Sequence, residues 1–161
     1  METIIPSGAD SKGKFMKTFT IGFTQKGANK FFTIIKENNV SRIIDVRVNN
    51  VSQLAGFAKR DDLKFFLSEL CNADYIHLEE LAPTKDILSD YKKKIITWED
   101  YEDKFLNLIA KRNIERSVDK SMLDNGCLLC SEHKPHFCHR RLVVEYLNKH
   151  WNTDIEVAHL I

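Results

Sequence analysis

The chain has 161 residues, of which 43% are hydrophobic and 29% are charged, and its formal net charge is +1. This length and composition are typical of one globular domain and exclude collagen-like, low-complexity and disordered classes. The near-neutral charge gives no global indication of binding to nucleic acid or to an anionic membrane. The apolar runs are too short to cross a bilayer and the amino terminus lacks a signal-peptide pattern, so we expect a cytoplasmic protein with reduced cysteines and no membrane partner.

Short apolar or β-branched runs alternate with amphipathic segments from residue 17 to the end of the chain. The predicted strands are residues 17–23, 41–48, 74–78, 126–130 and 154–160, and the predicted helices are residues 27–39, 61–71, 79–95, 97–123 and 140–151. Strands separated by helices predict a single compact α/β domain, 17–161, in which a mainly parallel sheet of about five strands carries helices on both faces. Residues 1–16 are polar and contain Pro and Gly, so we expect a flexible N-terminal tail.

A helical insertion, 86–116, separates the third predicted strand from the fourth. Thr97, followed by Asp100 three residues later, predicts a capping box at the start of its second helix. That helix has one apolar face, formed by Trp98, Tyr101, Phe105, Leu108 and Ile109. Such a face usually packs on the core, and a surface for another protein is the alternative.

Polar and reactive side chains follow the predicted strands at the points where the strands end. In an open α/β sheet, ligands bind beyond the carboxyl ends of the strands, because the loops there lead into helix N-termini whose free N–H groups attract anions. The residues at these ends are Gly22, Asp45, Arg47, His77, Cys130 and Glu132. We therefore expect them to gather around one site.

Asp45 and Arg47 lie two positions apart on a predicted strand, so their side chains point to the same face of the sheet. A carboxylate and a guanidinium in this arrangement either form an ion pair that fixes the loop or grip a polar ligand together. Both interpretations stay open. His77 is likewise either a ligand-binding side chain or a structural histidine.

The segment 127–141, CLLCSEHKPHFCHRR, concentrates thiols, imidazoles and guanidinium groups. A zinc site is one interpretation, with candidate ligands Cys127, Cys130, His133, His136, Cys138 and His139. However, Cys127 and Cys130 are three apart in a predicted strand and face opposite sides of the sheet. We therefore expect no bound metal, and no other cofactor is indicated. A disulfide between Cys130 and Cys138 would form only occasionally or under redox control in a reducing compartment.

Another interpretation places Cys138 at the start of the helix CHRRLVVEYL. The positive end of the helix dipole, with His139, Arg140 and Arg141 in the same turn, would lower the pKa of the Cys138 thiol and favour a nucleophilic thiolate. Arg140 would then hold an anionic group such as phosphate through two parallel hydrogen bonds. The alternative is a partly buried cysteine beside exposed arginines.

Several motifs, taken in order, resemble the family called domain of unknown function 488 (DUF488). They are TIGFT, DVR with NNVSQLAGFAKRDDL, YIHLEELAPT, LLCSEHKPHFCHRRLVVEYL and EVAHL, and they extend from Thr18 to the end of the chain. Within that family, the chain resembles the subgroup with NN-x-SQLAGF and LAPT motifs. Many relatives have His where this chain has Phe23, so the role of that histidine does not carry over.

The resemblance implies a compact α/β domain with its motif residues at one end of the sheet. Those residues are Gly22, Asp45, Arg47, Phe57, His77, Cys130, Glu132, Cys138, His139 and Arg140. The resemblance implies no established reaction, and Cys127, His133 and His136 fall outside the family pattern.

Together, these observations predict an enzyme that acts on a small anionic molecule, phosphorylated or nucleotide-like. The predicted catalytic groups are Cys138 as nucleophile or redox thiol and Glu132 or Asp45 as general acid or base. Arg47 and Arg140 would clamp the anion. The remaining predicted substrate-binding residues are Gly22, His77, Cys130 and His139. The alternative is a module that binds a ligand or nucleic acid without changing it, since basic residues are scattered along the chain.

Overall fold

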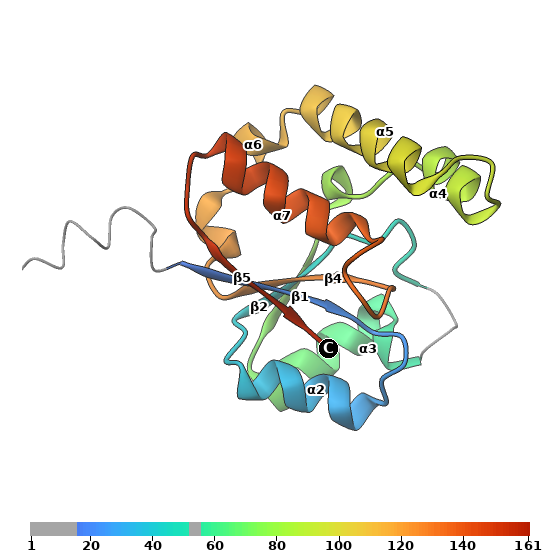
Figure 1. Cartoon of the computed structure of the whole chain (residues 1–161). Helices are drawn as coiled ribbons and strands as arrows, with labels where there is room; N and C mark the ends of the chain where they lie inside the picture. The colour runs from blue at the N-terminus through green and yellow to red at the C-terminus, as the bar shows by residue number, and fades with distance from the viewer. Residues whose placement is uncertain (1–15, 52–55) are drawn as a thin grey trace, which may run out of the picture.

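The computed structural model describes residues 16–51 and 56–161, which form a parallel sheet between two layers of helices (Figure 1). The strands are β1 Lys17–Gly22, β2 Arg42–Asp45, β3 Asp74–His77, β4 Gly126–Cys130 and β5 Glu156–Leu160. Their order across the sheet is β3-β2-β4-β1-β5, and every neighbouring pair is parallel. The predicted α/β class with a parallel sheet is confirmed. Residues 1–15 of the predicted tail lie outside the described residues, whereas Met16 packs against the core.

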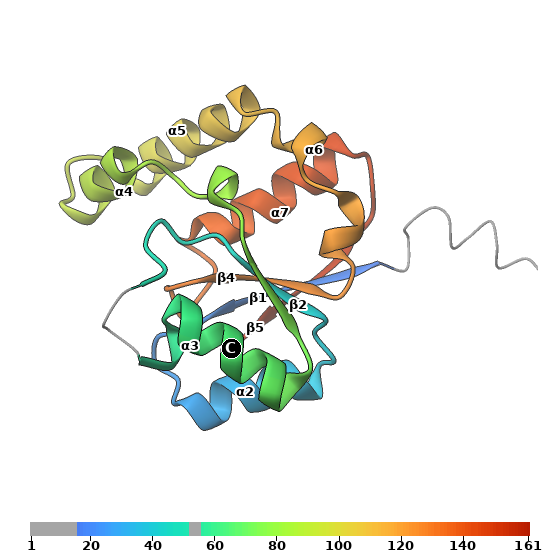
Figure 2. The ribbon, with the colours of Figure 1, turned by 180° about the vertical axis from the view of Figure 1, so that it is seen from behind.

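Helices cover both faces of the sheet (Figures 1 and 2). One face carries α2 Ala28–Glu37 and α3 Arg60–Phe66, which continues as a turn of π-helix over Leu67–Cys71. The other face carries α4 Lys85–Lys92, α5 Trp98–Lys111, α6 Ile114–Ser117 and α7 His139–His150. Two hydrophobic clusters, one on each side of the sheet, hold these layers together.

The alternation of side chains along each strand divides the core between the two clusters. Ile43, Cys127 and Leu129 pack with α2 and α3, whereas Ile44, Leu128 and Cys130 pack on the side of α5 and α7. The expectation that Cys127 and Cys130 face opposite sides of the sheet is therefore confirmed. Both thiols are buried, but only that of Cys130 lies on the α7 side.

Two long helices predicted after β3 are each broken into shorter pieces. Residues 79–95 form a 3-10 turn over Glu79–Leu81 and then α4, because Ala82 precedes Pro83 and adopts an extended conformation. Residues 97–123 divide into α5, α6 and a final 3-10 turn, because Asn113 takes a left-handed conformation with φ of 53°. Helical periodicity continues through both breaks and conceals them.

The start of α5 follows the sequence pattern. The Thr97 hydroxyl accepts a hydrogen bond from the Asp100 amide, and the Asp100 carboxylate accepts one from the Thr97 amide, both at 3.1 Å. Along the same helix, Tyr101, Phe105 and Ile109 are buried in the cluster that contains α7. These three residues of the apolar face therefore pack on the core, and Trp98 and Leu108 pack against the same cluster while partly buried.

Three adjacent strands, β1, β4 and β2, end together at one edge of the sheet. Gly22 pairs with Cys130, and Asp45 pairs with Leu129. Backbone hydrogen bonds extend this pairing beyond the strands, from the amide of Phe23 to the Cys130 carbonyl and from the amide of Val46 to the Leu129 carbonyl. This edge is thus a rigid base for the loops that follow.

Within residues 16–51 and 56–161, every helix is too short or too polar to cross a bilayer.

Candidate functional site

A cavity of about 310 Å³ lies at this edge, between the strand ends and the helices α4 and α5. Among the predicted site residues, those that line it are Arg47, Cys130, Glu132, Cys138 and His139. They come from the β2 loop, the end of β4 and the start of α7. The strand-end rule therefore predicted where the cavity lies.

Asp45 lies behind Arg47 and not in the cavity. The Asp45 carboxylate is fully buried and accepts hydrogen bonds from Nε and Nη2 of Arg47 at 2.9 and 2.8 Å. The Tyr75 hydroxyl donates to the same carboxylate at 2.5 Å. Burial lowers the pKa of Arg47, but the hydrogen bonds and charge of Asp45 outweigh it and raise this pKa above its usual value. The ion pair thus fixes Arg47 in its charged form.

Arg47 is nevertheless presented to the cavity. Its guanidinium lies over the Phe23 ring, 5.4 Å from the ring centre. Within the described parts of the chain, its Nη1 has no hydrogen-bond partner. His77, which lies outside the cavity, donates its Nε2–H to the Arg47 carbonyl at 2.9 Å. Asp45, Phe23 and His77 together therefore fix the side chain and backbone of Arg47.

Arg140 is fully buried and does not line the cavity. Its Nη1 donates to the Glu132 carbonyl at 2.6 Å and to Sγ of Cys138 at 3.4 Å, and its Nη2 donates to the His133 carbonyl at 3.3 Å. The guanidinium is thus used to hold the loop between β4 and α7. This placement differs from the predicted anion clamp, because loop carbonyls accept the hydrogen bonds of Nη1 and Nη2, the two groups that would hold the anion.

Gly22 brings β1 close to the same loop. A Cβ atom at this position would overlap the backbone carbonyl of Glu132. Glycine is therefore required for close packing of two backbones, not for contact with a ligand. The Gly22 carbonyl accepts a hydrogen bond at 2.9 Å from the buried ammonium of Lys26, which also donates to Nδ1 of His133 at 3.2 Å.

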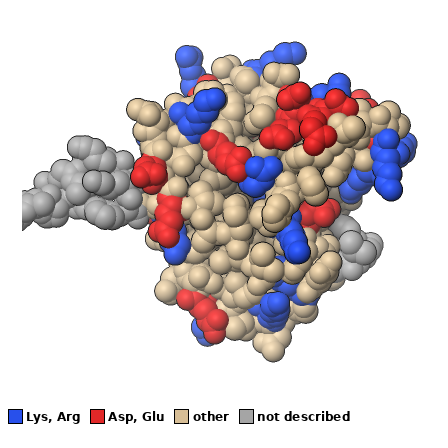
Figure 3. All heavy atoms as spheres, viewed as in Figure 1, with Lys and Arg blue, Asp and Glu red and all other residues tan. Residues whose placement is uncertain are grey.

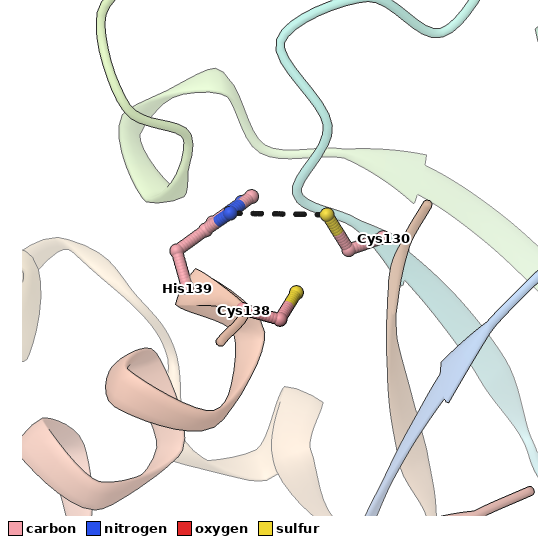
Figure 4. A group of neighbouring side chains, drawn as sticks. All are labelled: Cys130, Cys138 and His139. Atoms are coloured by element: carbon pink, nitrogen blue, oxygen red, sulfur yellow. Dashed lines mark hydrogen bonds between the residues drawn. The ribbon is translucent and has the colours of Figure 1, made fainter. Parts of the chain in front are cut away.

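Cys130, Cys138 and His139 form a buried cluster on the wall of the cavity (Figure 4). Nδ1 of His139 lies 3.8 Å from Sγ of Cys130. Nε2 of His139 lies 2.6 Å from the Val46 carbonyl, which can only accept a hydrogen bond. Nε2 therefore carries the proton, and Nδ1 presents its lone pair to the thiol. The Phe105 ring packs edge-on against the imidazole and fixes its plane.

The two thiols differ in acidity, and the difference is opposite to the expectation for Cys138. Burial, and then the neighbouring Cys130, raise the pKa of the Cys138 thiol well above its ordinary value and outweigh the opposing charges of His139 and Arg140. The hydrogen bond from Cys138 lowers the pKa of the Cys130 thiol despite its burial. Cys130 is thus the thiol of the pair whose pKa is lowered, and it is also the one whose sulfur faces Nδ1 of His139.

Sequence reasoning missed the side of the cavity that comes from the helical insertion. These residues are Leu88, Tyr91, Lys92 and Tyr101. The Tyr101 hydroxyl, unlike those of Tyr75 and Tyr146, has no hydrogen-bond partner within residues 16–51 and 56–161, and burial beside Cys130 and Cys138 raises its pKa. The apolar periodicity of α5 assigns Tyr101 to the core, and nothing in that pattern indicates that its hydroxyl end faces a cavity.

The fold and cavity define a class of protein, namely a parallel α/β domain with a thiol, imidazole and guanidinium centre at the carboxyl edge of its sheet. The chain belongs to the family described as domain of unknown function DUF488, whose model matches residues 27–147. The match includes Asp45, Arg47 and the segment from Cys130 to Arg140, whereas Gly22 and the final strand lie outside it. No curated protein and no solved structure matches the chain. Residues 52–55 of the NN-x-SQLAGF motif lie outside the described residues.

Proposed function

We propose that the protein is an enzyme that acts on a small anionic molecule bound in the cavity between the strand ends and the helical insertion. The observation that carries this proposal is that Arg47, Cys130 and His139 line the same cavity, with Sγ of Cys130 and Nδ1 of His139 3.8 Å apart. A thiol beside a histidine that a third group orients is the arrangement of a cysteine nucleophile and its base. Here Val46 orients the histidine through its carbonyl.

The roles of the other residues follow from their positions. Arg47 would bind the anionic group, and Tyr101 would donate a hydrogen bond to it from the opposite side. Asp45 and His77 would position Arg47, while Gly22 and Arg140 would position the loop that carries Cys138. Glu132 lines the cavity and reaches solvent, so it is the carboxylate suited to exchange protons with a bound substrate. The chemistry is thiol-dependent, and we place the enzyme in the cytoplasm, where free thiols persist.

The cavity size supports a small ligand. A volume of about 310 Å³ is at the lower end for small-molecule sites and is too small for a folded macromolecule. Basic side chains on the face shown in Figure 3 are scattered among acidic ones, and acidic side chains gather over α5. The face shown therefore has no continuous basic patch of the kind that nucleic acid binds.

Alkylation of the thiols tests the proposal while the substrate is still unidentified. Iodoacetate carries a carboxylate and iodoacetamide is its neutral analogue, so their rate ratio at one cysteine reports on a nearby positive charge. For Cys130 we expect the rate with iodoacetate, relative to the rate with iodoacetamide, to be about tenfold or more higher than for free cysteine. The reason is that Arg47 attracts the anionic reagent in a partly enclosed site. Peptide mass spectrometry assigns the modified cysteine.

Matched variants identify the source of the preference. The double variant Asp45→Asn with Arg47→Gln removes both charges of the buried pair together, so neither charge is left alone. It should abolish the preference for iodoacetate, whereas Lys93→Gln, a change at an exposed lysine outside the cavity, should preserve it. Equal rates of the two reagents at Cys130 in the wild-type chain, or faster modification of Cys138 than of Cys130, would overturn the proposed site.

A further inference from the structure

Two sulfur atoms and one ring nitrogen meet on the wall of the cavity. The ligand atoms of Cys130, Cys138 and His139 all lie within 4.8 Å of one another. Figure 4 shows the three side chains converging from the end of β4 and the start of α7. These donors come from two elements that other contacts already hold in place, so they are brought together by the fold and not by a mobile loop.

The spacing is suited to a metal ion of the zinc type. Thiolate sulfur and imidazole nitrogen are preferred zinc ligands, with bond lengths of about 2.3 and about 2.0 Å. A tetrahedral site with these bonds sets a sulfur and a nitrogen about 3.5 Å apart. The separation between Sγ of Cys130 and Nδ1 of His139 is 3.8 Å, so this pair needs only a small side-chain adjustment. The separations to Sγ of Cys138 lie within 4.8 Å, and its side chain would move towards the ion on binding.

The surroundings also match those of a metal ligand. A histidine that binds a metal through one ring nitrogen usually donates its other N–H to a carbonyl or carboxylate. Nε2 of His139 makes this contact with the Val46 carbonyl at 2.6 Å, which leaves the lone pair of Nδ1 directed at Cys130. Arg140 donates to Sγ of Cys138 at 3.4 Å, and a thiolate bound to zinc can accept the same hydrogen bond.

We infer that Cys130, Cys138 and His139 bind Zn²⁺ or a similar thiophilic divalent cation through three protein ligands, with a fourth position open to the cavity. All three residues line that cavity, and an open position beside three protein ligands is the arrangement of zinc sites that accept water or substrate. Coordination displaces any remaining thiol protons to solvent, and the two thiolates balance the charge of the ion. Cys127, on the opposite face of the sheet, takes no part.

This inference shares side chains with the proposed enzyme but does not depend on any reaction. A metal ion on Sγ of Cys130 would prevent this sulfur from acting as a nucleophile. The metal-loaded chain and the free-thiol chain are therefore different states of one site, and the cation and an alkylating agent should compete for Cys130.

Cobalt binding to the reduced, chelator-treated full chain tests the inference. We expect one Co²⁺ per chain, with the intense visible absorption of tetrahedral cobalt and sulfur-to-cobalt charge-transfer bands in the near ultraviolet, and displacement by Zn²⁺. Cys130→Ser and Cys138→Ser should each weaken Zn²⁺ binding by at least about a hundredfold, since loss of a supporting group alone costs about 10 to 100-fold. The matched control is Cys71→Ser, because Cys71 is half-buried, lies away from the cavity and donates to the Phe32 carbonyl as a serine also can.

A second measurement uses only the wild-type chain, so it tests the inference even if the serine variants do not fold. Zn²⁺ should protect Cys130 and Cys138 from alkylation but leave the rate at Cys71 unchanged. Weak octahedral-type cobalt absorption, unchanged affinity in Cys130→Ser, or equal protection of Cys71 would overturn the metal site. If the metal fails to bind while Cys130 still prefers iodoacetate, the inference falls and the proposed enzyme stands. If the metal binds but Cys130 of the metal-free chain shows no preference for iodoacetate, the metal site stands and the proposed enzyme falls.

Discussion

Arg47 and Asp45 form a buried ion pair with two parallel hydrogen bonds, at 2.9 and 2.8 Å, and the two side chains are 3% and 0% exposed. Arg47 also lines the cavity, so the ion pair that stabilises the fold is the same contact that positions a side chain of the site. Asp45→Asn should reduce the free energy of unfolding by about 3 to 5 kcal/mol, because it leaves the buried guanidinium without its counter-charge. Urea unfolding measures this loss.

The double variant Asp45→Asn with Arg47→Gln should lose less stability than Asp45→Asn alone, since it leaves no unpaired charge. Tyr75→Phe, which removes the hydroxyl that donates to Asp45 and accepts from Asn50, should cost about 1.5 to 3 kcal/mol, because the lost bond is to a charged carboxylate. A single Asp45→Asn variant as stable as the wild type would show that the pair does not fix Arg47.

The close approach of β1 to the β4–α7 loop gives a second prediction. Gly22→Ala should lower stability by about 3 kcal/mol or more, because the new methyl group would overlap the Glu132 carbonyl and neither backbone can move freely. Gly27→Ala is the matched control, since a Cβ there meets no atom within 4 Å. Similar urea midpoints for Gly22→Ala and the wild type would contradict the packing.

A histidine on the edge strand β5 should make stability depend on pH. Burial, then the charge of Arg140, lowers the pKa of His159, whose Nδ1 lies 2.7 Å from the Thr20 hydroxyl. As pH falls below the unfolded value of about 6.5, the unfolded chain takes up a proton that the native His159 resists. Stability contributed by neutral His159 is therefore lost on acidification.

His159→Asn keeps an acceptor for Thr20 and removes this titration. The wild type should lose more stability than this variant as the pH is lowered from about 7 towards the depressed native pKa. Urea unfolding at several pH values provides the comparison, and parallel curves for the two proteins would argue against the effect.

The capping box of α5 tests the anchoring of the helical insertion. Thr97→Ala should cost about 1 kcal/mol, because it removes the hydroxyl that accepts from the Asp100 amide. Without this cap the first turn of α5 should open more often, so its amides should exchange hydrogen faster. The same helix contributes Tyr101 to the cavity. Unchanged exchange there would mean that packing, not capping, fixes this end.

Local pattern predicts much of the architecture. Alternating apolar strands and amphipathic helices indicate a parallel sheet covered on both faces, and period-two alternation separates Cys127 from Cys130 correctly. The pattern misses the breaks at Pro83 and Asn113 because apolar periodicity continues across them, while the backbone changes direction at single residues. Hydrophobic periodicity reports which side of an element is buried but not where its hydrogen-bond ladder is interrupted.

Some site residues could likewise be predicted from the sequence, whereas others reach the cavity only through the folding of distant segments. Of the six residues that the sequence places at strand ends, Arg47, Cys130 and Glu132 line the cavity, whereas Gly22, Asp45 and His77 do not. Cys138 and His139, predicted from the start of the following helix, also line it. Arg140 does not line the cavity, because its Nη1 and Nη2 donate to carbonyls of the β4–α7 loop. No short sequence motif specifies the course of that loop. Tyr101 lies far from these residues in the sequence, so only the folding of the insertion over the strand ends brings it to the cavity.

The sequence by itself determined the parallel α/β architecture and the edge of the sheet at which reactive side chains collect, because these depend on alternation and chain order. Only the tertiary structure decided which thiol is the more acidic and that two thiols and an imidazole converge. Desolvation and hydrogen-bond partners control acidity, and both are set by side chains from other elements: burial raises the pKa of Cys138, while its hydrogen bond lowers that of Cys130.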